Sequence, residues 1–170
     1  MAEQNSWSPE VYGQLRQMAD ALMTRERQGH TLGATALTHE VWLRLLQSRN
    51  AHSLNRGEFL GLAAQAMRRI LTDHARKKMS AKRGGEARRT TFAGKSLHSE
   101  PEVFALDLDA ALLALQETDA ELGKLVELSF YGAFSTEEIA EALELSTRTV
   151  KRRWRFAKAW LQQYMLENES

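Results

Sequence analysis

Residues 134–154 read FSTEEIAEALELSTRTVKRRW, and this stretch predicts two helices joined by a tight turn. Ser135 and Glu138 have the spacing of a capping box, in which the serine hydroxyl accepts the Glu138 amide proton and the carboxylate accepts that of Ser135. A helix is therefore expected to begin at Ser135. Its inward face should consist of three apolar residues at helical spacing, Ile139, Ala140 and Leu143.

A second helix is expected directly after the turn. The turn passes through Glu144 and Leu145, with Leu145 pointing inward, and Ser146 is the natural N-cap of the helix that follows. Val150 and Trp154 lie four positions apart, so both should face the interior. The opposite face then begins with hydroxyl groups and continues with cations.

This exposed face has the chemistry of a DNA recognition helix. Short donors and Arg in the first turns can reach base edges in the major groove, and the cations beyond them can hold phosphates. The alternative is an ordinary helical hairpin with a basic face, which is less consistent with the capping, turn length and charge placement taken together. The residues predicted to contact DNA are Thr147, Arg148, Thr149, Lys151, Arg152 and Arg155.

The remaining sequence also predicts an all-α protein. The 170 residues are rich in helix formers, include only two prolines, and contain no alternating β-branched run that would indicate a strand. Cysteine is absent, which excludes disulfides, thiolate zinc sites and a cysteine nucleophile and fits a reducing cytosol. No signal peptide and no apolar run of about 18 residues is present. We therefore expect a cytoplasmic protein that enters no membrane.

Charge is segregated along the chain, although the net charge is only +1. Residues 66–95 contain ten Lys or Arg against two acids, a net of +8. Residues 99–144 contain twelve acids against one Lys, a net of −11, and residues 145–161 carry six cations and no acid. Two basic blocks thus flank an acidic one, and a nucleic acid could bind both basic blocks. For either block alone, a solvated helix face is an equal alternative.

Helical periodicity predicts three helices in the N-terminal half and resumes after a break. The first two carry apolar residues over 11–22 and 37–46, and the third is a long helix over 59–78 with a basic end. Gly84 and Gly85 begin a polar stretch that lasts until Pro101. We therefore expect two small helical domains joined by a flexible linker. Their predicted bounds are residues 8–83 and 103–166, with the linker at 84–102.

Three segments resemble the extracytoplasmic-function (ECF) branch of the sigma-70 family. Residues 128–140 resemble region 4, which in the family reads the −35 promoter element and binds the flap of the polymerase β subunit. Residues 37–45 resemble the region 2 helix that docks on the β′ coiled coil, and residues 59–76 resemble the helix that opens the −10 element. The resemblance implies a sigma factor with core RNA polymerase and promoter DNA as partners.

The same resemblance assigns roles in the N-terminal half. For core docking it implies Leu37, Glu40, Val41 and Arg44. For capture of a flipped −10 base and for holding the separated strands it implies Asn50, His52, Asn55, Arg56, Arg68, Arg69, Arg76 and Lys77. An ordinary solvated connection is the alternative for the polar loop at 48–56.

One departure from the family pattern concerns regulation. The docking helix of the family usually begins with acidic residues, whereas residues 33–36 here read GATA. A phosphate on Thr35 would restore negative charge near a helix N-terminus, where anions are favoured. Residues 35–40, TALTHE, resemble a subgroup associated with serine/threonine kinases. Activation by threonine phosphorylation is thus one hypothesis, and a simple N-cap role for Thr35 is the alternative. The sequence does not decide between control by a kinase and control by an anti-sigma factor.

Two other protein classes compete with this interpretation. A helix-turn-helix regulator with a ligand-sensing N-terminal half would bind duplex DNA without polymerase, but the basic 68–78 helix would make a poor ligand pocket. A helical metalloenzyme is disfavoured because the five histidines are scattered and His39-Glu40 lacks the second histidine of a zinc-protease helix. We therefore expect no catalytic residue, no cofactor and no metal.

Overall fold

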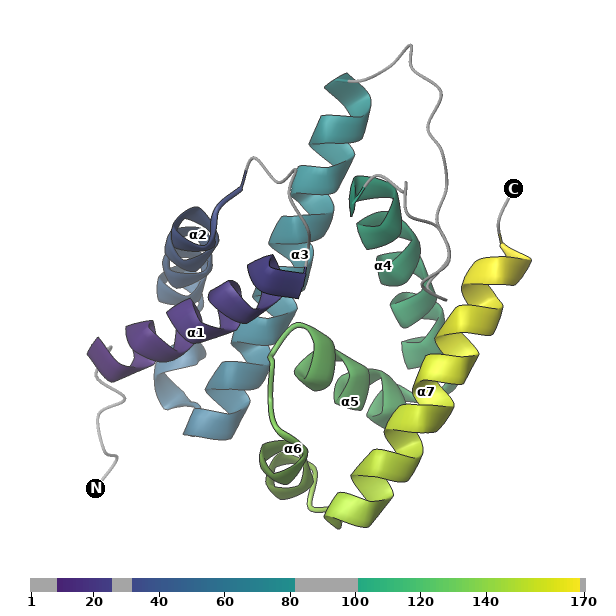
Figure 1. The fold of residues 1–170 in the computed structure, drawn as a ribbon. Helices are drawn as coiled ribbons and strands as arrows, with labels where there is room; N and C mark the ends of the chain where they lie inside the picture. Colours follow the sequence, from purple (N-terminus) through teal and green to yellow (C-terminus); the bar gives the residue numbers. More distant parts are fainter. Residues whose placement is uncertain (1–8, 26–31, 82–100, 169–170) are drawn as a thin grey trace.

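The computed structural model describes residues 9–25, 32–81 and 101–168, and all regular structure in these ranges is helical (Figure 1). The all-α prediction is confirmed. No helix in these ranges combines the length and apolar character needed to cross a bilayer. The elements are α1 (Pro9–Arg25), α2 (Ala34–Gln47), a 3-10 turn η1 (Ala51–Ser53), α3 (Arg56–Ala81), α4 (Pro101–Thr118), α5 (Ala120–Phe130), α6 (Thr136–Ala142) and α7 (Thr147–Glu167).

The three N-terminal helices pack as their periodicity predicted. Leu15 and Leu22 of α1, Leu37 of α2 and Met67 of α3 are all fully buried in one apolar cluster. Leu46 was predicted to face inward and is 41% exposed, because the buried stripe of α2 follows positions 37, 41 and 45. Burial of these stripes supplies the main stabilisation of the three helices.

A second capping box, which was not predicted from the sequence, starts α3. The Asn55 side-chain oxygen accepts the Glu58 amide proton at 2.9 Å, and Glu58 Oε2 accepts that of Asn55 at 3.0 Å. This reciprocal pair satisfies two of the amide groups that every helix start leaves without an intrahelical partner. It fixes the first residue of the longest helix in the described chain.

The C-terminal half is built from α4, α5 and α7, with α6 packed beside the start of α7 (Figure 1). Asp119 caps α5 by accepting the Leu122 amide proton at 2.9 Å. The helix ends at a close turn where Gly132 donates to the Glu127 carbonyl. A Cβ at Gly132 would lie 2.6 Å from the Leu128 carbonyl oxygen, so the turn has no room for a side chain.

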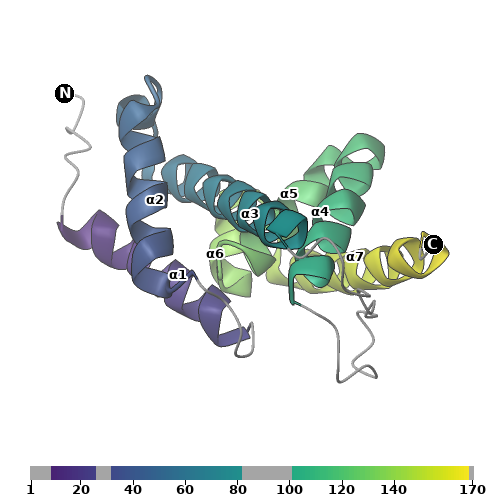
Figure 2. The same ribbon diagram turned by 90° about the horizontal axis from the view of Figure 1, so that it is seen from above.

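Helix α3 lies between the α1–α2 pair and α4, as the view in Figure 2 shows. One cluster of buried apolar residues contains members of α1, α2 and α3 together with members of α4, α5 and α7. A smaller cluster surrounds α6 and the start of α7. Most of the predicted linker, residues 84–100, lies outside the described residues, and α4 already begins at Pro101. The domain bounds therefore stay a prediction.

Candidate nucleic-acid interface

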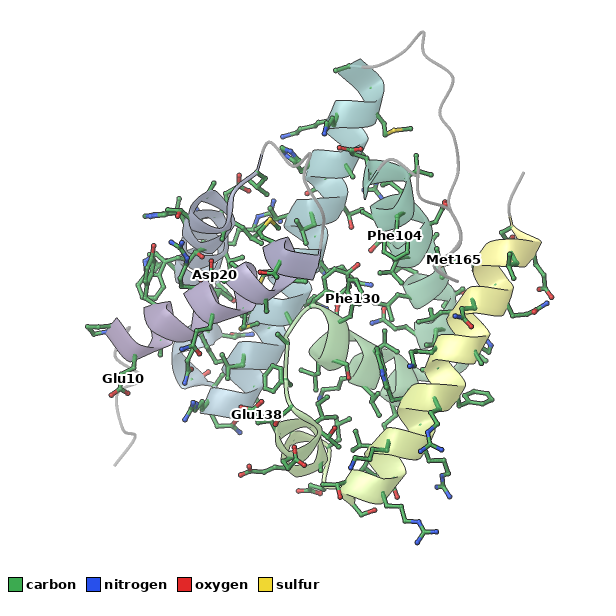
Figure 3. The ribbon with its side chains drawn as sticks, in the orientation of Figure 1. Glu10, Asp20, Phe104, Phe130, Glu138 and Met165 are labelled. Carbon is green, nitrogen blue, oxygen red and sulfur yellow. The ribbon has the colours of Figure 1, made fainter. Side chains whose placement is uncertain are left out.

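The predicted capping box at the start of α6 is confirmed. Ser135 Oγ accepts the Glu138 amide proton at 3.1 Å, and Glu138 Oε2 accepts the Ser135 amide proton at 2.7 Å. Glu138 is labelled in Figure 3, at the N-terminal end of this short helix. Ile139 and Ala140 are buried against the start of α7, as their spacing predicted.

A hydrogen-bonded reverse turn joins α6 to α7. The Leu145 amide donates to the Ala140 carbonyl at 2.9 Å, and the Glu144 amide donates to the Glu141 carbonyl at 3.3 Å. This pair of bonds defines a Schellman motif, in which the residue after the C-cap takes the left-handed conformation. Glu144 occupies that position with φ of 54°. Leu145 packs, partly buried, against the small cluster, as predicted.

Ser146 caps α7, which confirms the prediction for the start of this helix. Its Oγ accepts the Thr149 amide proton at 3.1 Å and lies 2.9 Å from the Thr149 hydroxyl, to which it donates. Thr149 is partly buried and engaged in this cap, so it supports the helix start. The other predicted contact residues are exposed: Thr147, Arg148, Lys151, Arg152 and Arg155.

The inward face of α7 holds this helix in place. Val150 is 2% exposed and Trp154 is partly buried against both apolar clusters. Arg153 pairs with Glu121 of α5, an ion pair that was not predicted from the sequence. Lys158 Nζ lies 5.9 Å from the centre of the Trp154 ring. Nitrogen-tipped side chains project outward from the N-terminal part of α7 (Figure 3).

Of the α3 cations predicted to hold the separated strands, some are exposed and one is buried. Arg69, Arg76 and Lys77 are exposed, whereas Arg68 is only 5% exposed. Arg68 Nε lies 2.9 Å from Glu127 Oε1 of α5, and its Nη1 lies 3.6 Å from Asp109 Oδ1 of α4. In this conformation Arg68 cannot reach DNA, because acids of the C-terminal half surround its guanidinium.

Burial also affects the carboxyl group that faces Arg68. Loss of water raises the pKa of Glu127, an effect that Arg68 and Arg69 oppose and Asp109 reinforces. The side chain of Glu127 is nearly as buried as that of Arg68. The pair is therefore an internal ionic contact rather than a surface salt bridge.

The polar loop before α3 presents only part of its predicted set. Asn50 and Arg56 are exposed, and the side chain of His52 lies outside the described part of the chain. Asn55 is exposed as well, but its side-chain oxygen caps α3. Base capture by Asn55 would compete with that cap.

Helix α2, which the resemblance predicts to dock on core polymerase, exposes a different set of residues from the predicted one. Leu37 and Val41 are fully buried in the core, so their side chains hold α2 on its neighbours and do not face a partner. Glu40 and Arg44 are exposed, and Arg44 lies 3.5 Å from Asp73 of α3. Leu43 is 57% exposed and shares their face, a position that the 37, 41, 45 stripe could have indicated.

Thr35 lies in the first turn of α2 and is exposed. The N-cap of α2 is Gly33, which makes no side-chain cap, so the alternative that Thr35 caps this helix is wrong. Instead the Thr35 hydroxyl accepts a hydrogen bond from Arg16 Nη1 at 2.7 Å. The same guanidinium binds Asp20 at 3.1 Å. The first turn of α2 contains no acid.

Comparison with known proteins gives one family. The family described as ECF sigma factor matches the chain over residues 2–167. No curated protein and no solved structure matches the chain. The match spans all the helices described above.

Proposed function

The chain belongs to the ECF sigma factor family and acts as an RNA polymerase sigma factor in promoter-directed transcription, and from this premise we propose how its helices divide the work. Helix α7 reads the −35 element, α3 and the loop before it open the −10 element, and α2 docks on the core enzyme. The observation that carries the proposal is the capped α6–α7 pair with its exposed cationic face. We retain residues 8–83 and 103–166 as the two functional domains.

The test of the whole proposal is transcription in vitro with purified core polymerase, followed by mapping of the start sites. The family role predicts discrete starts only when both proteins are present. A gel shift on the mapped promoter with and without core enzyme separates this role from that of an independent helix-turn-helix regulator. Full binding without core would favour the regulator and contradict the proposal.

The role of α7 can be tested by two Arg→Ala variants of the same helix. Arg152 is exposed on the proposed DNA face, whereas Arg153 is partly buried and pairs with Glu121. A lost base contact costs about 1–3 kcal/mol, which is roughly 5- to 150-fold in affinity. We expect Arg152→Ala to weaken binding of holoenzyme to the −35 element by that factor and Arg153→Ala to weaken it far less. Equal losses in both variants would contradict the assignment of this face.

Core docking is assigned to the exposed face of α2, which consists of Glu40, Leu43 and Arg44 and would meet the β′ coiled coil. Leu43 is a large apolar side chain left in solvent, as expected for part of an interface. We expect Leu43→Ser to weaken core binding, whereas the matched change Leu113→Ser, at an exposed leucine of α4, should not. The second contact, between the C-terminal domain and the β flap, is proposed from the family role alone.

We also propose that phosphorylation of Thr35 by a serine/threonine kinase strengthens core docking. Support comes from the exposed hydroxyl, the absence of acids in the first turn of α2, and the neighbouring Arg16. A phosphate would place nearly two negative charges at the helix N-terminus beside this guanidinium. The attraction between the phosphate and the Arg16 guanidinium would add to the favourable interaction of the phosphate with the helix dipole.

The measurement is the affinity for core polymerase of four variants. We expect Thr35→Glu to bind more tightly than the unmodified chain and Thr35→Val to bind no more tightly. Thr118→Glu, at an exposed threonine of α4, controls for added negative charge elsewhere. The double variant Arg16→Ala/Thr35→Glu should gain less affinity for core polymerase than Thr35→Glu alone. Equal affinity of Thr35→Glu, Thr35→Val and the unmodified chain would exclude the phosphorylation proposal.

A further inference from the structure

Arg56 is an exposed cation at the end of the polar loop proposed to capture a −10 base, and the fold restrains it at two points. It is the first residue of α3, and the reciprocal cap between Asn55 and Glu58 fixes the backbone there. Its guanidinium reaches α1, where the side-chain oxygen of Gln14 accepts hydrogen bonds from Nη2 and, at 3.0 Å, from Nε. The opposite orientation of the Gln14 amide would set its NH2 donors against the guanidinium donors. Gln14 therefore restrains the direction of this guanidinium.

The hydrogen bonds to Gln14 use one edge of the planar guanidinium and leave another edge for a ligand. The edge formed by Nε and Nη2 faces Gln14. The edge formed by Nη1 and Nη2 can then donate two parallel hydrogen bonds to one partner. Arg56 is exposed whereas Gln14 is partly buried, so a molecule that approaches from solvent can reach this second edge. A side chain that is already oriented loses less conformational entropy on binding than a freely rotating one.

Two parallel donors discriminate among the bases of a single strand. Guanine presents two neighbouring acceptors at O6 and N7, and cytosine presents two at N3 and O2, whereas adenine and thymine carry no two neighbouring acceptors. A phosphate also offers two acceptors, but every nucleotide has one, so a phosphate contact would give no base preference. An oriented arginine is therefore suited to a base whose edge carries a pair of acceptors. Flipped bases are read through hydrogen bonds to their edges, which is the contact that this guanidinium edge can make.

We propose that Gln14 is a positioning residue, which holds Arg56 so that this arginine selects guanine or cytosine at one position of the single-stranded −10 element. The inference rests on the proposed function, because that function assigns the −10 element to α3 and the loop before it. It goes further in two respects. It names the chemical class of base that is chosen, and it assigns the orientation of the reading side chain to a residue of α1, outside the loop.

The first measurement is the affinity of holoenzyme for the single-stranded non-template −10 sequence of the mapped promoter. Each position of this sequence is changed in turn to all four bases, and the affinities are compared within each position. A good bidentate contact discriminates against the wrong base by roughly 5- to 150-fold, so we expect one position at which guanine or cytosine is preferred within that range. Equal affinity for the four bases at every position would overturn the inference.

Variants of the two paired residues then assign the preference. Arg56→Lys keeps the positive charge but replaces the planar guanidinium by a single ammonium group, so it should lose the preference and keep most of the affinity. If Arg56→Lys kept the preference, or weakened binding of all four bases equally, base recognition by Arg56 would be excluded. Gln14→Met has a side chain of similar size without the acceptor. It should reduce the preference roughly 2- to 10-fold, because the freed arginine must be immobilised on binding.

Two more variants distinguish positioning from a merely structural role of Gln14. Gln14→Glu keeps an oxygen acceptor for Arg56, so it should retain the preference that Gln14→Met loses. Gln17→Met, at an exposed glutamine of the same helix, is the matched control and should leave the preference unchanged. Urea unfolding of each variant checks that the fold is intact. A full preference in Gln14→Met, or a loss as large in Gln14→Glu as in Gln14→Met, would refute the positioning role.

Transcription in vitro separates failure of this inference from failure of the sigma role. Core enzyme with each variant transcribes the mapped promoter carrying each of the four bases at the selected position. We expect the unmodified chain to initiate most often at promoters with the preferred base, and Gln14→Met to initiate more evenly. Discrete starts that do not depend on the base would overturn the inference while the sigma role stands. Absence of starts in every sample would instead contradict the proposed function, and with it the inference that rests on it.

Discussion

Glu144 is the residue whose substitution tests the turn between α6 and α7 most sharply. It takes the left-handed conformation, with φ of 54°, at the position of a Schellman motif where glycine is usual. A residue with a Cβ loses about 1–2 kcal/mol in this conformation. Glycine avoids that loss, but its freedom in the unfolded chain costs roughly 0.5–1 kcal/mol. Glu144→Gly should therefore stabilise the protein by about 0.5–1 kcal/mol.

The assay is thermal and urea unfolding of Glu144→Gly beside Glu144→Ala. For a chain of this size, 1 kcal/mol corresponds to a shift in Tm of about 2–4 °C, so we expect a rise of roughly 1–4 °C for the glycine variant. Glu144→Ala loses the same carboxylate but keeps a Cβ in the left-handed region, and it should gain little. The difference in stability between the two variants isolates the effect of the left-handed backbone conformation at residue 144. If the alanine variant were as stable as the glycine variant, strain at this turn would be refuted.

Three further predictions concern neighbouring parts of the fold. Gly132→Ala should destabilise the chain by about 1–3 kcal/mol in urea unfolding, because the new Cβ would meet the Leu128 carbonyl oxygen at 2.6 Å; an unchanged midpoint would show that this turn relaxes freely. Ser135→Ala should cost about 1 kcal/mol through loss of the α6 cap, whereas Ser135→Asp, which can cap, should cost less. Because burial raises the pKa of Glu127, its carboxyl binds a proton more tightly in the folded chain than in the unfolded chain. The protonated Glu127 carboxyl therefore stabilises the fold at pH values below its unfolded pKa, and this stabilisation is lost as pH rises through its folded pKa. The stability of the unmodified chain relative to Glu127→Gln should accordingly fall from acidic pH toward neutrality. A pH-independent difference in urea unfolding would contradict this shift.

Local signals in the sequence predicted local structure well. The capping box at Ser135, the N-cap at Ser146 and the inward position of Val150 are confirmed because each depends on residues within one helical turn. The Asn55 cap has an equally local signal, and it was missed because the polar loop was interpreted as a DNA contact. Local patterns become ambiguous where capping and ligand binding use the same side chains.

Long-range features could not be derived in the same way. Arg68 belongs to a basic run, and its burial depends on Asp109 and Glu127, which the sequence places far away in an acidic run. Leu37 and Val41 were assigned to docking from a resemblance that identifies a helix without identifying its exposed face. Which face of a helix is free is decided by packing against its neighbours, so it requires the fold.

The alternation of charge along the chain has a structural consequence that the net charge conceals. Acids of α4 and α5 neutralise cations of α3, whereas most cations of α7 point to solvent and only Arg153 is drawn into an ion pair with α5 in the described chain. The two proposed DNA-binding surfaces are therefore unequal in the free protein, because α7 is ready for a phosphate backbone and α3 is partly covered.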